Sequence, residues 1–296
     1  MEGNVNFDAW SRRELDAVEA ALDAWVPADA PAGLGQAMRY GVLDGGKRLR
    51  PLLVLAACEA VRGAREAALR AAVAVELIHA YSLVHDDMPC MDNDVLRRGK
   101  PTVHVQYGQA QAMLAGDAMQ ALAFEVLTPD SGVAPLLQAR LCALLARAAG
   151  HAGMAGGQAI DLSSIGQPLG EQALRDMHHR KTGALLQASV LMGAACGVTD
   201  AKAWQALSDY GDAIGLAFQV VDDILDVTQA SATLGKTAGK DADNNKPTYV
   251  TVLGLDAARR HADELRDTAL AALARSGLAQ AAWLSLLADK IVERDS

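Results

Sequence analysis

Residues 79–100 read HAYSLVHDDMPCMDNDVLRRGK, and this stretch contains many of the charged side chains that indicate the fold and function of the chain. Four aspartates fall within nine residues, and three basic residues follow at once: Asp86, Asp87, Asp92, Asp94, Arg97, Arg98 and Lys100. Apolar residues at helical spacing precede them, which predicts a helix leading into the cluster. Pro89 lacks an amide proton and restricts Met88, so this helix should end near Asp87. Carboxylates at a helix C-terminus face a negative macrodipole, so this arrangement is unfavourable without a cation.

A second acidic segment, DDILD at residues 222–226, argues against the simplest alternative, a solvated acidic loop. The helix predicted around it carries an apolar stripe and a separate polar stripe; the polar one holds Asp212, Gln219, Asp222 and Asp226. Clusters of carboxylates without histidine or cysteine suit hard cations, above all Mg²⁺. The two segments together therefore predict a magnesium site.

The composition indicates a soluble globular protein built from helices. Of the 296 residues, 51% are hydrophobic and 21% charged, aromatic residues make up 4%, alanine is abundant and strand signals are sparse. We expect a single all-α domain spanning residues 1–296. The net charge of −9 makes nucleic acid and anionic membranes poor candidate partners.

Cysteine usage and apolar runs bear on the compartment. The four cysteines are isolated and form no CxxC pair, so we do not expect a zinc or redox motif. Isolated, reduced thiols are typical of cytoplasmic proteins, so we expect a cytoplasmic location. Residues 1–25 are acidic and lack the apolar run of a secretory signal. The low-charge run at 183–198 is shorter than the roughly 20 residues of a spanning helix, so no stable membrane insertion is expected.

Basic residues near the acidic clusters could bind an anion. Lys47 and Arg50, in GGKRLRP at 45–51, are three apart near a predicted helix start; a solvated basic turn is the alternative. His79 shares a helix face with Asp86, although a lone histidine is more often structural. Residues 234–246 are rich in glycine and lysine, which predicts a mobile loop that closes over an anion.

The segments together resemble the trans-prenyltransferases, or polyprenyl diphosphate synthases, and are most similar to the bacterial farnesyl diphosphate synthases. The matching segments are DDMPCMD with RRG, DDILD with GKTAGKD, GGKRLRP, GQAIDL at 157–162, HRKTGAL at 179–185 and NKPTY at 245–249. They follow the family order across residues 45–249. Cys90 and Asn93 depart mildly from the first motif. Related sequences often carry aspartate at the position of Asn93.

The resemblance implies an all-α helical bundle around a central cavity. It also implies Mg²⁺-dependent head-to-tail condensation of isopentenyl diphosphate with dimethylallyl or geranyl diphosphate to farnesyl diphosphate. The allylic diphosphate ionises, the isopentenyl double bond attacks, and proton loss completes the product. Three Mg²⁺ ions with substrate bound and a homodimer are further expectations from the family.

Site residues follow from the same resemblance, position by position. The expected metal ligands are Asp86, Asp92 and Asp222, with Asp87, Asp161 and Asp226 ranked next. The isopentenyl diphosphate pocket would comprise Lys47, Arg50, His79 and Arg98. The allylic diphosphate and the developing cation would contact Arg97, Lys181, Thr182, Gln219, Lys236 and Lys246. Of these, the resemblance gives catalytic roles to Arg97, Lys181, Thr182, Gln219 and Lys236.

Product length rests on Tyr81, five residues before Asp86 and about 7.5 Å along a helix. In short-chain synthases an aromatic residue here forms the pocket floor, which predicts a C15 product. Tyr81 is also turned about 140° from Asp86 on a helix, so it could instead pack in the core.

Three other functions are alternatives to farnesyl diphosphate synthesis. A geranylgeranyl diphosphate synthase is the nearest alternative. A class I terpene cyclase would normally lack DDILD and need no GGKRLRP pocket, and a non-catalytic homologue would have lost aspartates or lysines that this chain retains.

Overall fold

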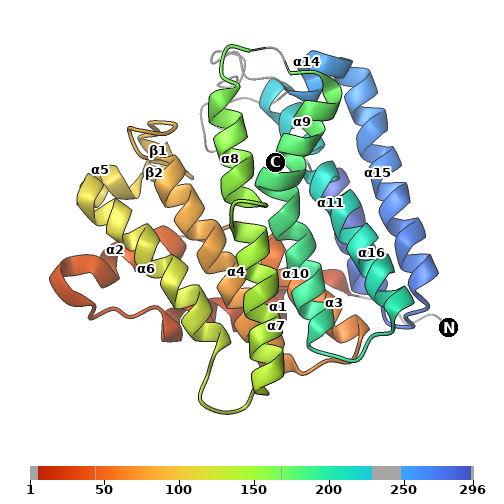
Figure 1. The fold of residues 1–296 in the computed structure, drawn as a ribbon, viewed down its shortest axis with the longest axis horizontal. Helices are drawn as coiled ribbons and strands as arrows, with labels where there is room; N and C mark the ends of the chain where they lie inside the picture. The colour runs from red at the N-terminus through yellow and green to blue at the C-terminus, as the bar shows by residue number, and fades with distance from the viewer. Residues whose placement is uncertain (1–5, 44, 168, 229–247, 295–296) are drawn as a thin grey trace.

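The computed structural model describes residues 6–43, 45–167, 169–228 and 248–294, and most of these lie in α-helices (Figure 1). The predicted all-α class is confirmed. Two predicted substrate-binding lysines, Lys236 and Lys246, lie outside the described residues.

The first half of the chain runs from α1 to α6. Its elements are α1 (Phe7–Trp25), the 3₁₀ turn η1 (Pro31–Gly33), α2 (Leu34–Val42), α3 (Leu49–Ala60), α4 (Arg65–Asp86), β1 (Leu96–Arg97), β2 (Lys100–Pro101), α5 (Val103–Tyr107) and α6 (Gln109–Leu127). The second half comprises α7 (Pro135–Ala149), α8 (Met154–Ser163), α9 (Glu171–His178), the π-helical turn η2 (His179–Gly183), α10 (Ala184–Ala195), α11 (Ala201–Thr228), α14 (Tyr249–Leu253), α15 (Leu255–Ser276) and α16 (Ala282–Val292).

Helices α3, α4, α10 and α11 form the centre of the bundle, with α6 packed on α4 and α15 packed on α11 (Figure 1). Helix α4 is apolar on nearly all sides, and every residue of the segment 71–78 is buried. By length and composition α4 could cross a membrane, but 67% of its apolar stretch is buried inside the protein. A core helix of a soluble protein has the same character. This buried helix carries the first acidic cluster at its C-terminal end.

Residues 135–162 have a mostly helical sequence in which the glycine pair 156–157 is the expected interruption, but the structure places the break elsewhere. The glycine pair Gly156–Gly157 lies inside α8, and the chain breaks earlier, between α7 and α8. A Cβ atom on Gly157 would lie 2.2 Å from the backbone nitrogen of Lys181. The glycine therefore serves close packing of α8 on η2 rather than a turn.

A short β-hairpin follows the acidic loop, where no strand was expected. Residues Leu96 and Arg97 pair antiparallel with Pro101 and Lys100. The two loop residues between them, Arg98 and Gly99, have positive φ angles of 52° and 77°. Positive φ at both positions is the mark of a type I′ turn, which fits the twist of a two-residue hairpin.

Gly183 permits a kink or a close backbone approach after Thr182, and the structure has the π-helical turn η2 there. Gly183 packs on Gly215 of α11, where a Cβ atom on Gly215 would lie 2.7 Å from the Gly183 Cα atom. This close approach brings the residues before Gly183 beside α11. Single π turns of this kind are frequent at functional sites.

Candidate active site

The acidic loop after α4 folds back on the end of that helix. The Asp92 backbone N–H donates to the Asp86 carbonyl at 2.8 Å, and the Asp94 N–H donates to the Asp87 carbonyl at 3.1 Å. Asn93, one of the departures noted above, has a φ of 52°. Asparagine tolerates this left-handed region better than most residues, so it suits the turn.

The ionised form of the Asp86 carboxylate is destabilised by its surroundings. The pKa of Asp86 is raised to about 6, because burial outweighs the lowering by the Lys181 ammonium and the nearby Asp92 carboxylate adds to the rise. Desolvation and like charge both disfavour the ionised form. A hard cation shared by Asp86 and Asp92 would relieve both effects, so the donor chemistry of this pair fits Mg²⁺.

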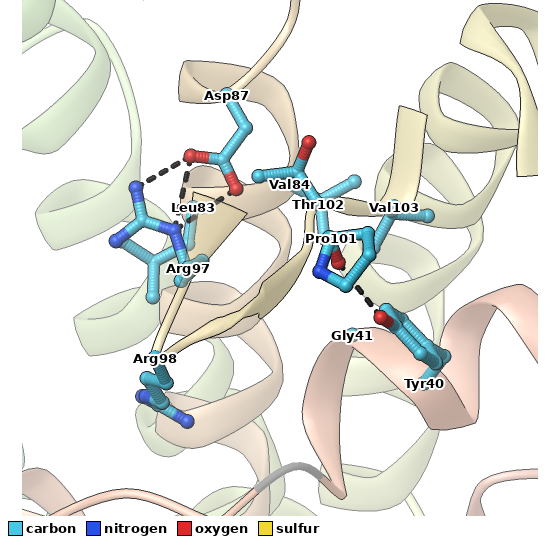
Figure 2. A pocket seen from close by; sticks show the side chains of 10 residues that line it. All are labelled: Tyr40, Gly41, Leu83, Val84, Asp87, Arg97, Arg98, Pro101, Thr102 and Val103. Carbon is cyan, nitrogen blue, oxygen red and sulfur yellow. Dashed lines mark hydrogen bonds and ion pairs between the residues drawn. The ribbon is translucent and has the colours of Figure 1, made fainter. Parts of the chain in front are cut away.

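Asp87 has a different partner. Its buried carboxylate accepts from the Arg97 guanidinium in a bidentate pair, with Nε at 2.9 and 3.0 Å and a terminal nitrogen at 2.5 Å (Figure 2). Paired contacts of this geometry are strong and orient the guanidinium. In this structure Asp87 therefore holds Arg97, and the roles predicted for Asp87 as a ligand and Arg97 as a diphosphate contact stay predictions.

The hollow beside this pair is small. It measures about 30 Å³ and lies between α2, α4 and the hairpin, with the Tyr40 hydroxyl donating to the Pro101 carbonyl at 2.7 Å (Figure 2). A space of that size holds about one water molecule. The contacts around it fasten the hairpin, and hence Arg97, to the helices.

The predicted isopentenyl diphosphate residues come together in part. Burial lowers the pKa of His79 well below its usual value, and Arg50, Arg98 and Arg97 lower it further, so the imidazole is neutral among cations. Arg50 is 9% exposed, and its Nε has no hydrogen-bond partner among the described residues. A buried guanidinium with an unused donor favours an anion.

Arg48 is a different kind of residue from its neighbours. It is buried and pairs with Glu19 at 2.6 Å and Glu76 at 2.7 Å. These carboxylates neutralise it, so Arg48 anchors the start of α3 while Lys47 and Arg50 flank it. Lys47 lies near the second acidic motif, since the Asp222 carboxylate raises the pKa of Lys47 against the larger lowering by burial.

Asp222, the predicted ligand of the second motif, pairs with Arg294 near the C-terminal end of the chain at 2.6 Å. No local sequence pattern predicts this contact, which joins residues 72 positions apart. Among the residues that the structure describes, no group of three or more His, Cys, Asp and Glu side chains could hold a metal ion. Magnesium, however, commonly takes one or two carboxylates and completes its shell with water and phosphate oxygens.

Lys181 and Thr182 of η2 lie beside other predicted site residues. The Lys181 ammonium lies 2.6 Å from the buried carboxylate of Asp161, so this aspartate, ranked second among the expected metal ligands, has an ion-pair partner here. The Thr182 hydroxyl donates to the Gln219 side-chain oxygen at 3.0 Å. Nearby, His178 is buried and its ring stacks on the Tyr249 ring.

A cavity of about 410 Å³ is lined by several of the predicted site residues. Its charged and polar lining includes Arg50, His79, Asp86, Gln158, Lys181 and Thr182, and its apolar lining includes Leu83, Met91, Met154 and Leu162. Both side-chain atoms of Gln158 are buried without a partner among the described residues. Tyr81 lines the same cavity as Asp86 and also packs against the hydrophobic core, so it meets both placements considered for it. The cavity can hold an anionic group and an apolar chain together.

Comparison with known proteins gives one consistent result. Residues 31–281 match the family model described as polyprenyl synthetase. The chain is 47% identical to geranylgeranyl pyrophosphate synthase 9, chloroplastic, of Arabidopsis thaliana over 294 residues, which cover 98% of this chain and 82% of the relative.

Two solved structures are similar throughout. An FPP/GFPP synthase from Zymomonas mobilis has a TM-score of 0.86 and 41% identity, with 97% of this chain and 99% of that one covered. A geranyltransferase from Helicobacter pylori, complexed with magnesium and isoprenyl diphosphate, has a TM-score of 0.85 and 33% identity over 99% of this chain and 98% of that one.

Proposed function

The chain belongs to the polyprenyl synthetase family, and from this premise we propose that it condenses isopentenyl diphosphate with an allylic diphosphate. The reaction joins the two prenyl units head to tail, releases pyrophosphate and lengthens the allylic diphosphate by five carbons. A trans-prenyl diphosphate synthase is the function that the family and its relatives support.

The observation that carries the proposal is the mixed lining of the 410 Å³ cavity. Arg50, with its unpaired Nε, and neutral His79 offer hydrogen-bond donors to one diphosphate. Lys181 and Asp86 lie elsewhere on the lining and suit a second diphosphate with its cations. Leu83, Met154 and their apolar neighbours would surround the prenyl chains and keep water away from a reactive cation.

Mg²⁺ would be held by Asp86, Asp92 and Asp222, and when bound it neutralises diphosphate oxygens. The protein's own cations supply the remainder of the electrostatic stabilisation. Lys181 would turn from Asp161 toward the leaving pyrophosphate, and Arg97 would present the face of its guanidinium that Asp87 does not occupy. The released pyrophosphate is the proposed acceptor of the final proton.

The relatives of this chain are named for products of different chain length. The similar plant enzymes are named geranylgeranyl pyrophosphate synthases, which favours a C20 product for this chain over the C15 product predicted from its sequence. One observation keeps C15 as a second candidate, namely that Tyr81 lines the cavity and could limit its depth. The Zymomonas mobilis protein is named an FPP/GFPP synthase, so structurally similar relatives carry names for different products.

Chromatography of the products made from isopentenyl diphosphate and each allylic starter tests the proposal directly. Asp86→Ala and Asp222→Ala should each lower turnover on the order of 10³-fold, because both remove charge stabilisation of the transition state. Asp117→Ala, an exposed helical aspartate, is the matched control and should retain activity. Full activity of either motif variant, or of wild type in excess chelator, would refute the assignment.

The cellular location and the oligomeric state are expectations from the sequence and the family. Several relatives are named as chloroplastic, so the cytoplasmic location predicted from the cysteines stays a prediction. The homodimer, the number of magnesium ions and the roles of Lys236 and Lys246 are likewise predictions from the family.

A further inference from the structure

Three hydrogen bonds connect the cavity wall to the second acidic motif. The Thr182 hydroxyl donates to the Gln219 side-chain oxygen at 3.0 Å, and the Gln219 amide nitrogen donates to one Asp223 oxygen at 2.8 Å. The Tyr249 backbone N–H donates to the other Asp223 oxygen at 2.7 Å. The series therefore ties η2, α11 and α14 together.

The direction of these bonds is set at Asp223. An ionised carboxylate only accepts hydrogen bonds, and a backbone N–H only donates. Gln219 must therefore turn its NH₂ group to Asp223 and its oxygen to Thr182. Thr182 has one hydroxyl proton, and this proton is committed to Gln219, so the oxygen lone pairs are the groups left for other partners.

Thr182 lines the 410 Å³ cavity, whereas Asp223 is 2% exposed and does not line it. Asp222, its neighbour, is 38% exposed at the side chain and pairs with Arg294. Adjacent residues on an α-helix point about 100° apart, which explains how two aspartates of one motif serve different partners.

We propose that Asp223 is a positioning residue that fixes the hydrogen-bond polarity of Thr182, so that the cavity wall presents oxygen lone pairs instead of an O–H donor. The inference rests on the proposed function, which places an allylic cation in this cavity. Fixed lone pairs stabilise a nearby positive charge without reorganisation, whereas a hydroxyl proton aimed at it would be repelled.

Asp223→Asn should reverse the donor–acceptor direction of the hydrogen bonds from residue 223 to Thr182, with little change in side-chain shape. Asparagine can keep an oxygen for the Tyr249 N–H and offer an NH₂ group to Gln219. The Gln219 amide then turns over and donates to Thr182, whose proton is released toward the cavity. We expect kcat to fall about 10- to 100-fold, with the KM for isopentenyl diphosphate within about twofold of wild type.

A double variant separates polarity from structure. In Gln219→Glu/Asp223→Asn, asparagine donates to the new carboxylate, which can again accept from Thr182. We expect the double variant to recover most of the kcat that Asp223→Asn loses, while Gln219→Glu alone opposes two carboxylates and stays impaired. A double variant no better than the single ones would overturn the proposal.

Coupling to Thr182 gives a second criterion. In a Thr182→Val background the hydroxyl is absent, so Asp223→Asn should lower kcat no further than about twofold. A full additional loss there would mean that Asp223 acts by another route, and thermal melting of each variant would show whether the fold is kept.

A binding measurement keeps this inference distinguishable from the proposed function. The probes are an allylic diphosphate analogue with a tertiary ammonium group in place of a chain carbon, and its all-carbon isostere. Calorimetry should show that wild type prefers the cationic probe and that Asp223→Asn lowers this preference about tenfold. An unchanged preference would overturn the polarity argument, whereas absent turnover in wild type would overturn only the proposed reaction.

Discussion

The guanidinium of Arg294 lies 2.6 Å from Oδ1 of Asp222, although the two residues are 72 positions apart. The same guanidinium donates to the Phe218 carbonyl at 2.6 Å and stacks over the Phe218 ring at 3.9 Å. The Arg294 side chain is 10% exposed and that of Asp222 is 38% exposed, so the guanidinium is shielded from solvent while the carboxylate stays partly accessible. Arg294 thus neutralises the carboxylate that is the proposed metal ligand of the second motif, and a metal ion must compete with it.

Arg294→Gln should strengthen metal binding to the substrate-free protein. Removing the competing cation frees Asp222, and an ion pair of roughly 1 kcal/mol corresponds to about a fivefold gain in affinity. Titration with Mn²⁺ by calorimetry measures it directly. Arg259→Gln, which removes an exposed arginine of α15, should leave the affinity unchanged. Equal or weaker binding by Arg294→Gln would show that the pair does not oppose the metal.

Asp86 should make the stability of the metal-free protein depend on pH. Its pKa is raised to about 6, so the folded state prefers the protonated carboxyl. That contribution is complete below the unfolded pKa near 4 and is lost as the pH rises through 6. Asp86→Asn should therefore raise the free energy of unfolding at pH 7.5, by on the order of 2 kcal/mol, and change it little at pH 4.

Denaturant unfolding in chelator at the two pH values checks this. The same measurement with saturating Mg²⁺ and pyrophosphate should invert the order, because the wild-type carboxylate then has its cation. If Asp86→Asn gives no more stabilisation at pH 7.5 than at pH 4, the carboxyl does not titrate as described.

Arg50 and Lys181 should affect different substrates. Arg50→Ala should raise the KM for isopentenyl diphosphate about tenfold or more, because its buried guanidinium has a donor to spare, and change the allylic KM little. Lys181→Ala should show the opposite bias. Steady-state kinetics with each substrate varied in turn separates the two, with Arg12→Ala as an exposed control. Equal effects on both substrates would mean that the two pockets are wrongly assigned.

Tyr81 should limit product length, whether the wild-type product is C15 or C20. Its ring lines the cavity on the same helix as Asp86 and contacts the His85 ring at 5.7 Å between centroids. Tyr81→Ala should therefore lengthen the main product by at least one five-carbon unit. Tyr107→Ala, which removes an aromatic ring outside the cavity lining, should not. An unchanged product from Tyr81→Ala would place the floor elsewhere.

Much of the fold follows from local patterns, because apolar spacing marks a helix without reference to the remainder of the chain. The predicted helix before the first motif ends at Asp86, within one residue of the expected Asp87. The hairpin escaped prediction because its strands have two residues each and depend on positive φ at Arg98, a non-glycine residue.

The site was less predictable, because its pairings join distant segments. Nothing in KRLR separates Arg48 from Arg50, yet Glu19 and Glu76 neutralise only the first through contacts 29 and 28 residues away. Arg294 carried no local signal at all. Local sequence identifies which side chains can bind an anion, whereas long-range packing decides which of them already have a counter-ion.

The π-helical turn at residues 179–183 has a consequence for how this site tolerates change in chain length. Such a turn equals an α-helix that has gained one residue, and each residue of an α-helix advances the direction by about 100°. Lys181 and Thr182 are neighbours in the chain, yet both line the cavity. Deleting a single residue here could restore a regular helix with its packing on α11 intact and still rotate the ammonium or the hydroxyl out of the cavity. Single-residue insertions and deletions, like substitutions of Lys181 or Thr182 themselves, are thus expected to remove the function of this cavity wall while the helical bundle still folds.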